Sequence, residues 1–493
     1  MARTTGSQPN IVLIISDQHN ANVMGCAGNP IVRTPNLDAL DGQGARFTNV
    51  YCPYPLCAPS RAGFLAASYP SEVGAFDNSG TLSPQTPTFA HALAVAGYET
   101  VLCGRMHFIG PDQLHGFGKR IHADCGGTLS PEIRGSGNNR TTGQSKYAVE
   151  VAGYGTTGYQ AFDDSVTETA CNDISSWTGD GQPHCLVVGL ILPHNPLICS
   201  RPLFDRYMEE IPLPEPVSPA YLDALHPAMR NWRARRGVDE LTPEQNRRAL
   251  AAYYGLVTEL DGNVGRIVRA VRASPAAENT IIVYCSDHGD MACEHGMWWK
   301  SSHYDGSARV PLIVSLPGHW PCGRNDAVIS LIDVGPTLLE LAGAPPLPDV
   351  SGRSFAGFLG DDAPIPDWPD EVYSEYIGLL GDQPACMVRC GPWKLNYYHE
   401  FRSCQLFNMD QDPGEMHDRA QDPDCRKIAA DLQDRIHARW SAERMLNDAE
   451  RQNRARDLIR RSGTGPAPHS VAPFIPPDGC NRFDFSQLPG HGP

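Results

Sequence analysis

The chain has 493 residues and a formal net charge of −16 at pH 7. This length exceeds what one compact core usually serves, so we expect one large domain and a smaller one. The acidic balance and the lack of a long basic run argue against nucleic acid and anionic membrane surfaces as partners. No run of about 18 apolar residues exists that could span a membrane.

The N-terminus and the cysteines indicate where in the cell the protein is located. Residues 1–9 lack the apolar segment of a secretory signal. The sixteen cysteines are scattered without C-x-x-C pairs, a pattern typical of reduced thiols and unlike a disulfide framework or a zinc ribbon. We therefore expect a cytoplasmic location.

The first predicted strand, residues 10–16, is followed by Asp17 and Gln18. A fully apolar strand ending in polar residues is typical of an open α/β sheet, whose ligands lie at the carboxyl ends of the strands. A carboxylate and an amide oxygen suit Ca²⁺ or Mg²⁺. The alternative is an ordinary Asx turn after a strand.

Residues 55–63 form a loop that leads into a predicted helix over 60–67. Pro59 suits the first turn of a helix because it has no N–H to leave unpaired. Cys57 then lies at the positive end of the helix, which lowers a thiol pKa, and Arg61 can bind oxygens near it. The alternative is a buried structural cysteine, the commoner fate of a free thiol.

Two further predicted strands end in cationic or imidazole groups. The strand at 100–103 precedes Arg105 and His107, and the strand at 184–192 precedes His194, which has a proline on each side. Prolines restrict the backbone and so help to aim His194. Between them, residues 124–160 are rich in Gly, Ser, Thr and Asn and are expected to form a long loop over the mouth of the site. A helix is predicted over 162–177.

A second strand that is followed by possible metal ligands is predicted over residues 280–286, and Asp287 and His288 come directly after it. A long helix is predicted over 244–272, before this strand. Lys300 follows twelve residues after His288. On its own, Lys300 would be read as a solvated surface cation.

The C-terminal part of the chain changes in character. A Pro-rich linker is expected at 344–370, followed by antiparallel strands at 372–376, 385–389, 393–398 and 405–407 and a helix at 426–456. The expected division is a catalytic domain over 1–370, a small α+β domain over 371–461 and a Pro/Gly-rich tail over 462–493 that is disordered or packs between subunits.

Residues 57–61 read Cys-Ala-Pro-Ser-Arg and match the C-x-P-S-R signature of type I sulfatases, which the chain resembles. Segments in the order and spacing of that family extend from about residue 10 to Pro413. The resemblance implies the alkaline-phosphatase-like α/β/α sandwich with a large mixed sheet, plus a small antiparallel sheet-and-helix domain. It also implies that a formylglycine-generating enzyme oxidises Cys57 to formylglycine, whose hydrate is the nucleophile.

The resemblance assigns roles to the residues noted above. It implies one divalent cation, Ca²⁺ with Mn²⁺ or Mg²⁺ as alternatives, held by Asp17, Gln18, the residue-57 side chain, Asp287 and His288. The implied catalytic residues are Cys57, Arg61, Arg105, His107, His194 and Lys300. His107 is implied to release sulfate, while His194 and Lys300 hold the sulfuryl group and assist the leaving alcohol. The implied substrate-binding residues are Asn78, His115, His194 and Lys300.

Within the family, the Asp-Gln and Asp-His pairs resemble the choline-sulfatase and phosphonate-hydrolase branches, and the string 108–117 resembles choline sulfatases. Choline sulfatases place an aromatic residue shortly after this string, whereas residues 123–128 have none. Quaternary ammonium groups bind aromatic faces, so we expect a bulkier aryl or saccharide sulfate ester as substrate. The alternatives are choline sulfate, a phosphonate monoester or phosphodiester, and a silent binder of sulfated ligands. A homo-oligomer, dimer or tetramer, is expected.

Overall fold

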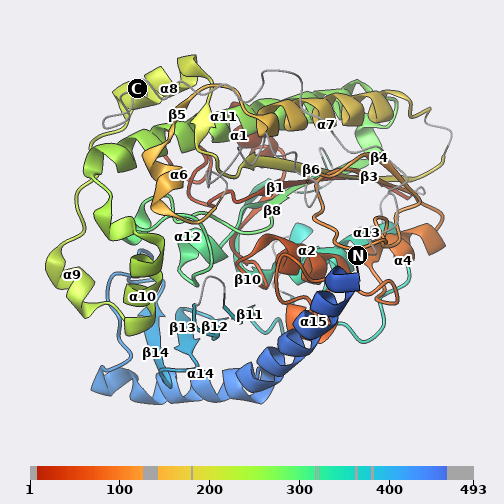
Figure 1. Cartoon of the computed structure of the whole chain (residues 1–493). Helices are drawn as coiled ribbons and strands as arrows, with labels where there is room; N and C mark the ends of the chain where they lie inside the picture. Colours follow the sequence, from red (N-terminus) through yellow and green to blue (C-terminus); the bar gives the residue numbers. More distant parts are fainter. Residues whose placement is uncertain are drawn as a thin grey trace.

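The computed structural model describes residues 8–125, 143–178, 181–316, 318, 320, 322–360, 365–378 and 382–462. Much of the loop expected over the site, and the tail after residue 462, lie outside the described residues. A large eight-stranded sheet and a small four-stranded sheet, each with helices packed against it, dominate the described residues, which also contain a short two-stranded sheet (Figure 1). The expected combination of a large mixed sheet and a small antiparallel one is confirmed.

The large sheet is built around β1 (Asn10–Asp17), which pairs in parallel with β6 (His184–Pro193) and β8 (Thr280–Ser286). The strand order is β10-β2-β9-β8-β1-β6-β3-β4. Strand β9 (Leu312–Ser315) runs antiparallel to both neighbours, which makes the sheet mixed. The remaining strands are β2 (Ala45–Tyr51), β3 (Glu99–Gly104), β4 (Lys119–His122) and β10 (Gly323–Ser330).

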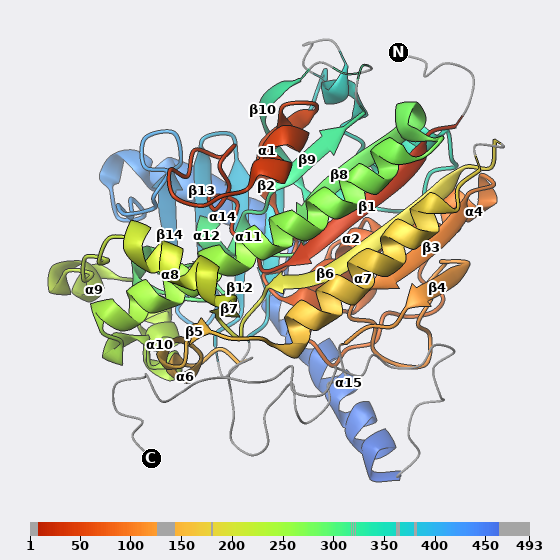
Figure 2. The ribbon, with the colours of Figure 1, turned by 90° about the horizontal axis from the view of Figure 1, so that it is seen from above.

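Both faces of the large sheet are buried, which explains the unbroken apolar run of β1. Val12 and Ile14 pack into one core, whereas Ile11, Leu13 and Ile15 pack into the other. The first core lies under α7 (Gly158–Ser175) and α11 (Pro243–Ala273), which run side by side across the sheet (Figure 2). The second lies against α2 (Cys57–Ala66), α4 (Phe89–Val95) and α13 (Val334–Ala342).

The small antiparallel sheet has the order β11-β12-β13-β14. Its strands are β11 (Glu371–Tyr376), β12 (Ala385–Cys390), β13 (Trp393–Tyr398) and β14 (Ser403–Asn408). The single helix expected at 426–456 is wrong: α14 (Arg426–Arg439) and α15 (Ala442–Ser462) are separated by Trp440 and Ser441. Trp440 is extended and buried, and the Ser441 hydroxyl accepts a hydrogen bond from the Arg444 N–H at 3.2 Å, which caps α15.

The small sheet holds the segment that leads into α2. The Glu375 N–H of β11 donates to the Pro53 carbonyl at 2.8 Å, and the Ile377 N–H donates to the Tyr54 hydroxyl at 3.1 Å. The Tyr54 and Tyr376 rings meet edge to face at 5.5 Å. Cys57, three residues after Tyr54, is therefore braced from the C-terminal part of the chain.

A buried charge cluster connects the small sheet to the segment that follows Lys300. Lys394 of β13 lies between Asp305 at 2.5 Å and Glu415 at 2.9 Å and is fully buried. Asp305 begins α12 (Asp305–Ala308), five residues after Lys300. Because a buried lysine needs carboxylates to offset its lost hydration, this contact ties the small sheet to the segment carrying Lys300.

The stretch expected as a linker at 344–370 instead contributes Phe355 and Leu359 to the core beside α13. Among the described residues, no helix combines the length and apolarity that a membrane crossing demands. The other helices and short strands are α1 (Pro35–Asp41), α3 (Pro70–Val73), α6 (Lys146–Glu150), β5 (Gly153–Tyr154), β7 (Ile198–Cys199), α8 (Arg201–Glu210), α9 (Pro219–Ala224) and α10 (Pro227–Arg236).

Candidate active site

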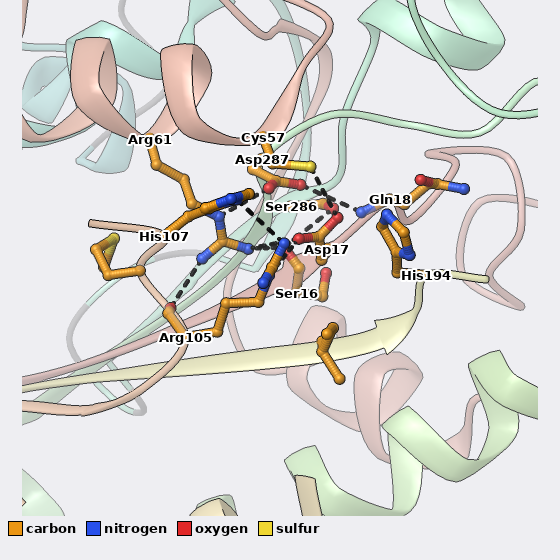
Figure 3. Close-up of polar contacts among 12 residues, drawn as sticks. Ser16, Asp17, Gln18, Cys57, Arg61, Arg105, His107, His194, Ser286 and Asp287 are labelled. Carbon is orange, nitrogen blue, oxygen red and sulfur yellow. Dashed lines mark hydrogen bonds and ion pairs between the residues drawn. The ribbon is translucent and has the colours of Figure 1, made fainter. Parts of the chain in front are cut away.

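Side chains from four neighbouring strand ends converge on one buried site. The strands β8, β1, β6 and β3 are adjacent and parallel, so their carboxyl ends meet at the same edge. That edge carries Asp287, Asp17, His194 and Arg105, respectively, and Figure 3 shows them facing the Cys57 side chain. The structure thus brings together residues that the sequence places directly after these strands.

Helix α2 presents Cys57 to the site. The helix begins at Cys57 rather than at Ser60, so the predicted start was three residues late. Pro59 contributes no N–H, and the Ala58 N–H donates to the Asn78 side-chain oxygen at 3.0 Å. The first turn thus leaves few unpaired donors, which lets the helix start early. Cys57 is 1% exposed.

The Cys57 sulfur is surrounded by polar groups. The Lys300 ammonium lies 3.1 Å away, the His288 Nε2 3.2 Å away and an Asp17 oxygen 3.6 Å away. Burial opposes ionisation of the thiol, but the charges of Lys300 and His288 and hydrogen bonds from His107 and His194 outweigh it. They hold the pKa of Cys57 well below its usual value. The position favours a group that carries negative charge.

Four side chains form a group suited to a cation. Ligand atoms of Asp17, Cys57, Asp287 and His288 all lie within 4.8 Å of one another, and all four residues are buried. Two carboxylates favour a hard divalent ion, and the imidazole nitrogen also admits Mn²⁺. The donor set therefore fits a single divalent cation.

Two buried arginines balance the two carboxylates. The Arg105 Nε donates to Asp17 at 2.6 Å, and the Arg61 Nε donates to Asp287 at 2.8 Å. Burial and the nearby Cys57 raise the pKa of Asp17, but Arg105, His194 and Lys300 lower it more, so the net pKa lies below its usual value. Asp17 is thus held in the ionised form that a metal ligand needs.

His107 follows β3 in a left-handed backbone conformation, with φ of 61°. Its Nδ1 lies 3.2 Å from Arg105 Nη2, and its N–H donates to Asp124 at 2.5 Å. A non-glycine residue with positive φ is costly and persists only where its surroundings hold it. The Asp124 contact was not predicted from the sequence.

His194 and Lys300 approach the sulfur together. The Lys300 ammonium lies 2.9 Å from His194 Nε2 and 2.7 Å from the Gln18 side-chain oxygen. Gln18 donates through its nitrogen to Asp290 at 2.6 Å. In this arrangement the Gln18 oxygen faces Lys300, so its expected role as a metal ligand stays a prediction. Asp290, which orients Gln18, was also missed.

The two remaining residues expected to bind substrate lie differently. Asn78 uses its oxygen to cap α2, next to Cys57. His115 is 2% exposed, packs on the Phe108 ring at 4.4 Å and faces Asp112 at 3.3 Å. None of these His115 contacts is with the group around Cys57, so the structure gives no support to a role for His115 in the pocket.

Comparison with known proteins identifies the family. The family model described as "Sulfatase" matches residues 9–344. The "Choline-sulfatase" of Rhizobium meliloti (strain 1021) is 34% identical over 482 residues, which cover 92% of this chain and 91% of the relative. The chain belongs to the sulfatase family. It is accordingly a hydrolase of sulfate esters.

Further comparisons match this sulfatase to other sulfatases and to a phosphonate hydrolase. A model described as "N-sulphoglucosamine sulphohydrolase, C-terminal" matches residues 293–441. "Arylsulfatase K" of Gallus gallus is 29% identical, covering 83% of this chain and 78% of the relative. The phosphonate monoester hydrolase structure from Silicibacter pomeroyi superposes with a TM-score of 0.72 at 25% identity, covering 87% of this chain and 95% of its own.

A more distant structure supports the fold. The complex of a protein with its substrate D-glucosamine-2-N,6-O-disulfate superposes with a TM-score of 0.71 at 22% identity, covering 90% of this chain and 99% of its own. Sulfatases are metal-dependent, and the group at Asp17, Cys57, Asp287 and His288 provides this sulfatase with a candidate site.

Proposed function

We propose that this sulfatase cleaves an organic sulfate monoester with a formylglycine hydrate made from Cys57 by a formylglycine-generating enzyme. The observation that carries the proposal is the position of the Cys57 sulfur, at the start of α2 and within 3.1 to 3.6 Å of Lys300, His288 and Asp17. An inert structural thiol needs no such set of charges. These polar groups around residue 57 suit the oxygens of a hydrated aldehyde.

The proposed cation is Ca²⁺, with Mn²⁺ or Mg²⁺ as alternatives, bound by Asp17, Asp287, His288 and an oxygen of residue 57. Gln18 joins this set if its oxygen turns from Lys300. A bound dication supplies positive charge that stabilises the developing negative charge on the sulfuryl oxygens. Arg61 and Arg105 hold the two carboxylates in place.

The chain's own groups account for the proton transfers. One hydroxyl of the hydrate attacks sulfur and releases its proton to solvent, and the S–O bond to the alcohol breaks. The alcohol departs with a proton delivered from the His194–Lys300 pair, which then regains a proton from solvent. His107 then removes the proton of the remaining hydroxyl, the C–O bond to sulfate breaks, and the aldehyde re-forms. Addition of water to the aldehyde restores the hydrate, so the sum is ester plus water giving alcohol, sulfate and a proton.

Mass spectrometry of the peptide containing Cys57 tests the nucleophile. We expect an aldehyde at residue 57 in active preparations, and we expect Cys57→Ala to abolish turnover while the fold is retained. The circular dichroism spectrum of the variant serves as the control. Turnover by the Ala variant near the normal rate contradicts the mechanism.

For the alcohol part of the substrate we propose an aryl or saccharide group. Asp124, in the stretch that lacks an aromatic residue, turns inward to the Met106 and His107 N–H groups and offers no wall to a small cation. Choline sulfate is the second candidate, favoured by the 34% identical relative and by Tyr159, whose ring lies 6.1 Å from that of His194.

A substrate panel separates these candidates. It contains 4-nitrophenyl sulfate, sulfated monosaccharides, choline sulfate and a phosphonate monoester, compared by kcat/KM. The phosphonate tests the alternative raised by the Asp-Gln and Asp-His pairs and by the phosphonate hydrolase structure. A higher kcat/KM for choline sulfate than for every aryl and saccharide ester overturns the proposed preference. Light scattering tests the proposed homo-oligomer, a dimer or tetramer.

A further inference from the structure

Two buried carboxylates lie behind the site and hold the main chain beside its two histidines. Asp163 of α7 is fully buried, and its two oxygens accept hydrogen bonds from the Ile191 N–H at 2.8 Å and the Leu192 N–H at 2.9 Å. These two N–H groups lie two and three positions before His194. One carboxylate thus binds two consecutive main-chain donors at the end of β6.

Asp124 does the same at the end of β3. Its Oδ2 accepts from the Met106 N–H at 2.8 Å and from the His107 N–H at 2.5 Å. Arg105 and Arg120 lie 3.8 and 3.4 Å from its oxygens, so the carboxylate is flanked by two cations. Strands β3 and β6 are neighbours, so the two carboxylates serve adjacent strand ends.

The strand ends need such partners for a physical reason. Where neighbouring strands diverge, their last N–H groups lose their ladder partners, and a buried N–H without an acceptor is costly. A carboxylate can accept several hydrogen bonds at once and so directs two N–H groups to one point. His107 has the additional cost of its positive φ, which the Asp124 contacts offset.

We propose that Asp124 and Asp163 are positioning residues of the sulfatase reaction: Asp124 places His107 for sulfate release, and Asp163 places His194 for alcohol release. This inference rests on the proposed function, because the two histidines have separate steps only in that mechanism. Each carboxyl group binds main-chain N–H groups at or just before its histidine, so each acts through that backbone. Tyr159, one turn before Asp163 on α7, packs against His194 from the same helix.

The geometry predicts different effects of amide and alanine substitutions. In Asp163 each oxygen serves one N–H, so Asp163→Asn leaves one N–H facing an amide nitrogen, and Asp163→Ala leaves both without an acceptor. In Asp124 one oxygen serves both N–H groups, so Asp124→Asn can keep these bonds while it loses the attraction of Arg105 and Arg120. We therefore expect Asp124→Asn to be milder than Asp124→Ala, and Asp163→Asn to be already severe.

The test is rapid-mixing kinetics with 4-nitrophenyl sulfate on protein whose aldehyde content is known. We expect Asp124→Ala to keep the fast first release of 4-nitrophenol and to slow the steady state by about 10- to 100-fold, the same defect that we expect of His107→Ala. Asp163→Asn and Asp163→Ala should slow the first release itself by a similar factor and abolish the burst, the same defect that we expect of His194→Ala. Asp164→Asn, the exposed neighbour of Asp163 on α7, is the matched control.

The outcomes separate the inference from the function on which it rests. Wild-type protein that carries the aldehyde but releases no 4-nitrophenol overturns the proposed function for aryl esters, and with it the assignment of steps. If the two His variants show their separate defects while the Asp variants stay within about twofold of wild type per folded molecule, only the positioning roles are overturned. Should the Ala variants fail to fold, Asp163→Asn decides for Asp163, and Asp124→Asn, with its smaller defect in sulfate release, decides for Asp124.

Discussion

At the scale of single residues, Asp17 connects the main parts of the site. One of its oxygens lies 3.6 Å from the Cys57 sulfur, and the other accepts from Arg105 at 2.6 Å and lies 3.5 Å from Arg61. Asp287 pairs with Arg61 in the same way. Two carboxylates and two guanidinium groups thus cancel in charge, which lets a buried cluster of ions persist.

Removing either carboxylate charge tests the proposed metal site. We expect Asp17→Asn and Asp287→Asn each to lower the affinity for the divalent ion by about 10-fold or more, because each replaces a charged oxygen ligand of a hard cation. Metal content per protein, measured by elemental analysis after dialysis, and turnover should fall together. Asp164→Asn provides the control, and full metal content in both site variants argues against the assignment.

At the scale of elements, the site depends on how closely β3 and β6 approach. The Arg105 N–H donates to the Gly189 carbonyl at 2.9 Å, and a Cβ added to Gly189 would lie 1.7 Å from the Arg105 carbonyl oxygen. The contact is between backbones, so no side chain can move aside. Glycine at residue 189 therefore allows Arg105 to reach Asp17.

Gly189→Ala should accordingly push the two strands apart. We expect a loss of about 1–3 kcal/mol or more in the free energy of unfolding, from urea denaturation, together with loss of turnover. Gly262→Ala is the matched control, because Gly262 lies in α11 with open space around its Cβ position. Alanine there should leave stability unchanged or raise it. Equal stability of both variants contradicts this explanation.

The contact between α7 and β6 should make the free energy of unfolding depend on pH. Burial raises the pKa of Asp163 from 3.8 to about 8, against the lowering effect of the Ile191 and Leu192 N–H groups. Between about pH 4 and pH 8 the folded chain keeps a proton that the unfolded chain has lost, so this group's contribution to stability falls as pH rises. It is fully present below about pH 4.

Asp163→Asn cannot titrate, so it isolates this effect. The difference in unfolding free energy between wild type and Asp163→Asn should shrink as pH rises through this window and stay constant outside it. Urea denaturation at a series of pH values, with Asp164→Asn alongside, measures the difference. If the difference in unfolding free energy between wild type and Asp163→Asn instead grows as pH rises, the sign is opposite and Asp163 is ionised in the folded state.

The sequence predicted the strand ends well and their supports poorly. Asp17, His194 and Asp287 follow apolar runs, and the convergence of parallel strand ends brought them together as expected. Asp124 and Asp163 lie in a loop and in a helix, and their partners are main-chain groups distant in sequence, which no local pattern marks. The break at Trp440 was missed for a similar reason, because burial of its ring outweighs the helical pattern on either side.

At the scale of the whole molecule, Lys394 joins the two sheets. It lies between Asp305 of the large domain and Glu415 beyond the small sheet, with all three groups buried. Attraction to the two carboxylates, Asp305 first, raises the pKa of Lys394 despite its burial, so the charge is retained. Without it, two buried carboxylates would face each other.

Lys394→Met should cost about 3–5 kcal/mol of unfolding free energy, because it leaves buried charge uncompensated. We also expect weaker turnover, since Asp305 follows Lys300 by five residues. Lys427→Met on α14 is the control: that lysine pairs with Asp431 at 2.6 Å on the surface, and its loss should not shift the urea midpoint. If Lys394→Met and Lys427→Met have comparable urea midpoints, Lys394 does not stabilise the contact between the two sheets.

Because β11 hydrogen-bonds the segment before Cys57, this segment can take up its final position only after β11 has been synthesised. Glu375, which donates to Pro53, leaves the ribosome roughly 300 residues after Cys57. At about 5–20 residues per second, that interval lasts roughly 15 to 60 seconds. A protein-sized reagent can reach the thiol during this interval, whereas in the finished fold only 1% of Cys57 is exposed. Any enzyme that converts Cys57 must therefore act on the growing chain or on unfolded protein.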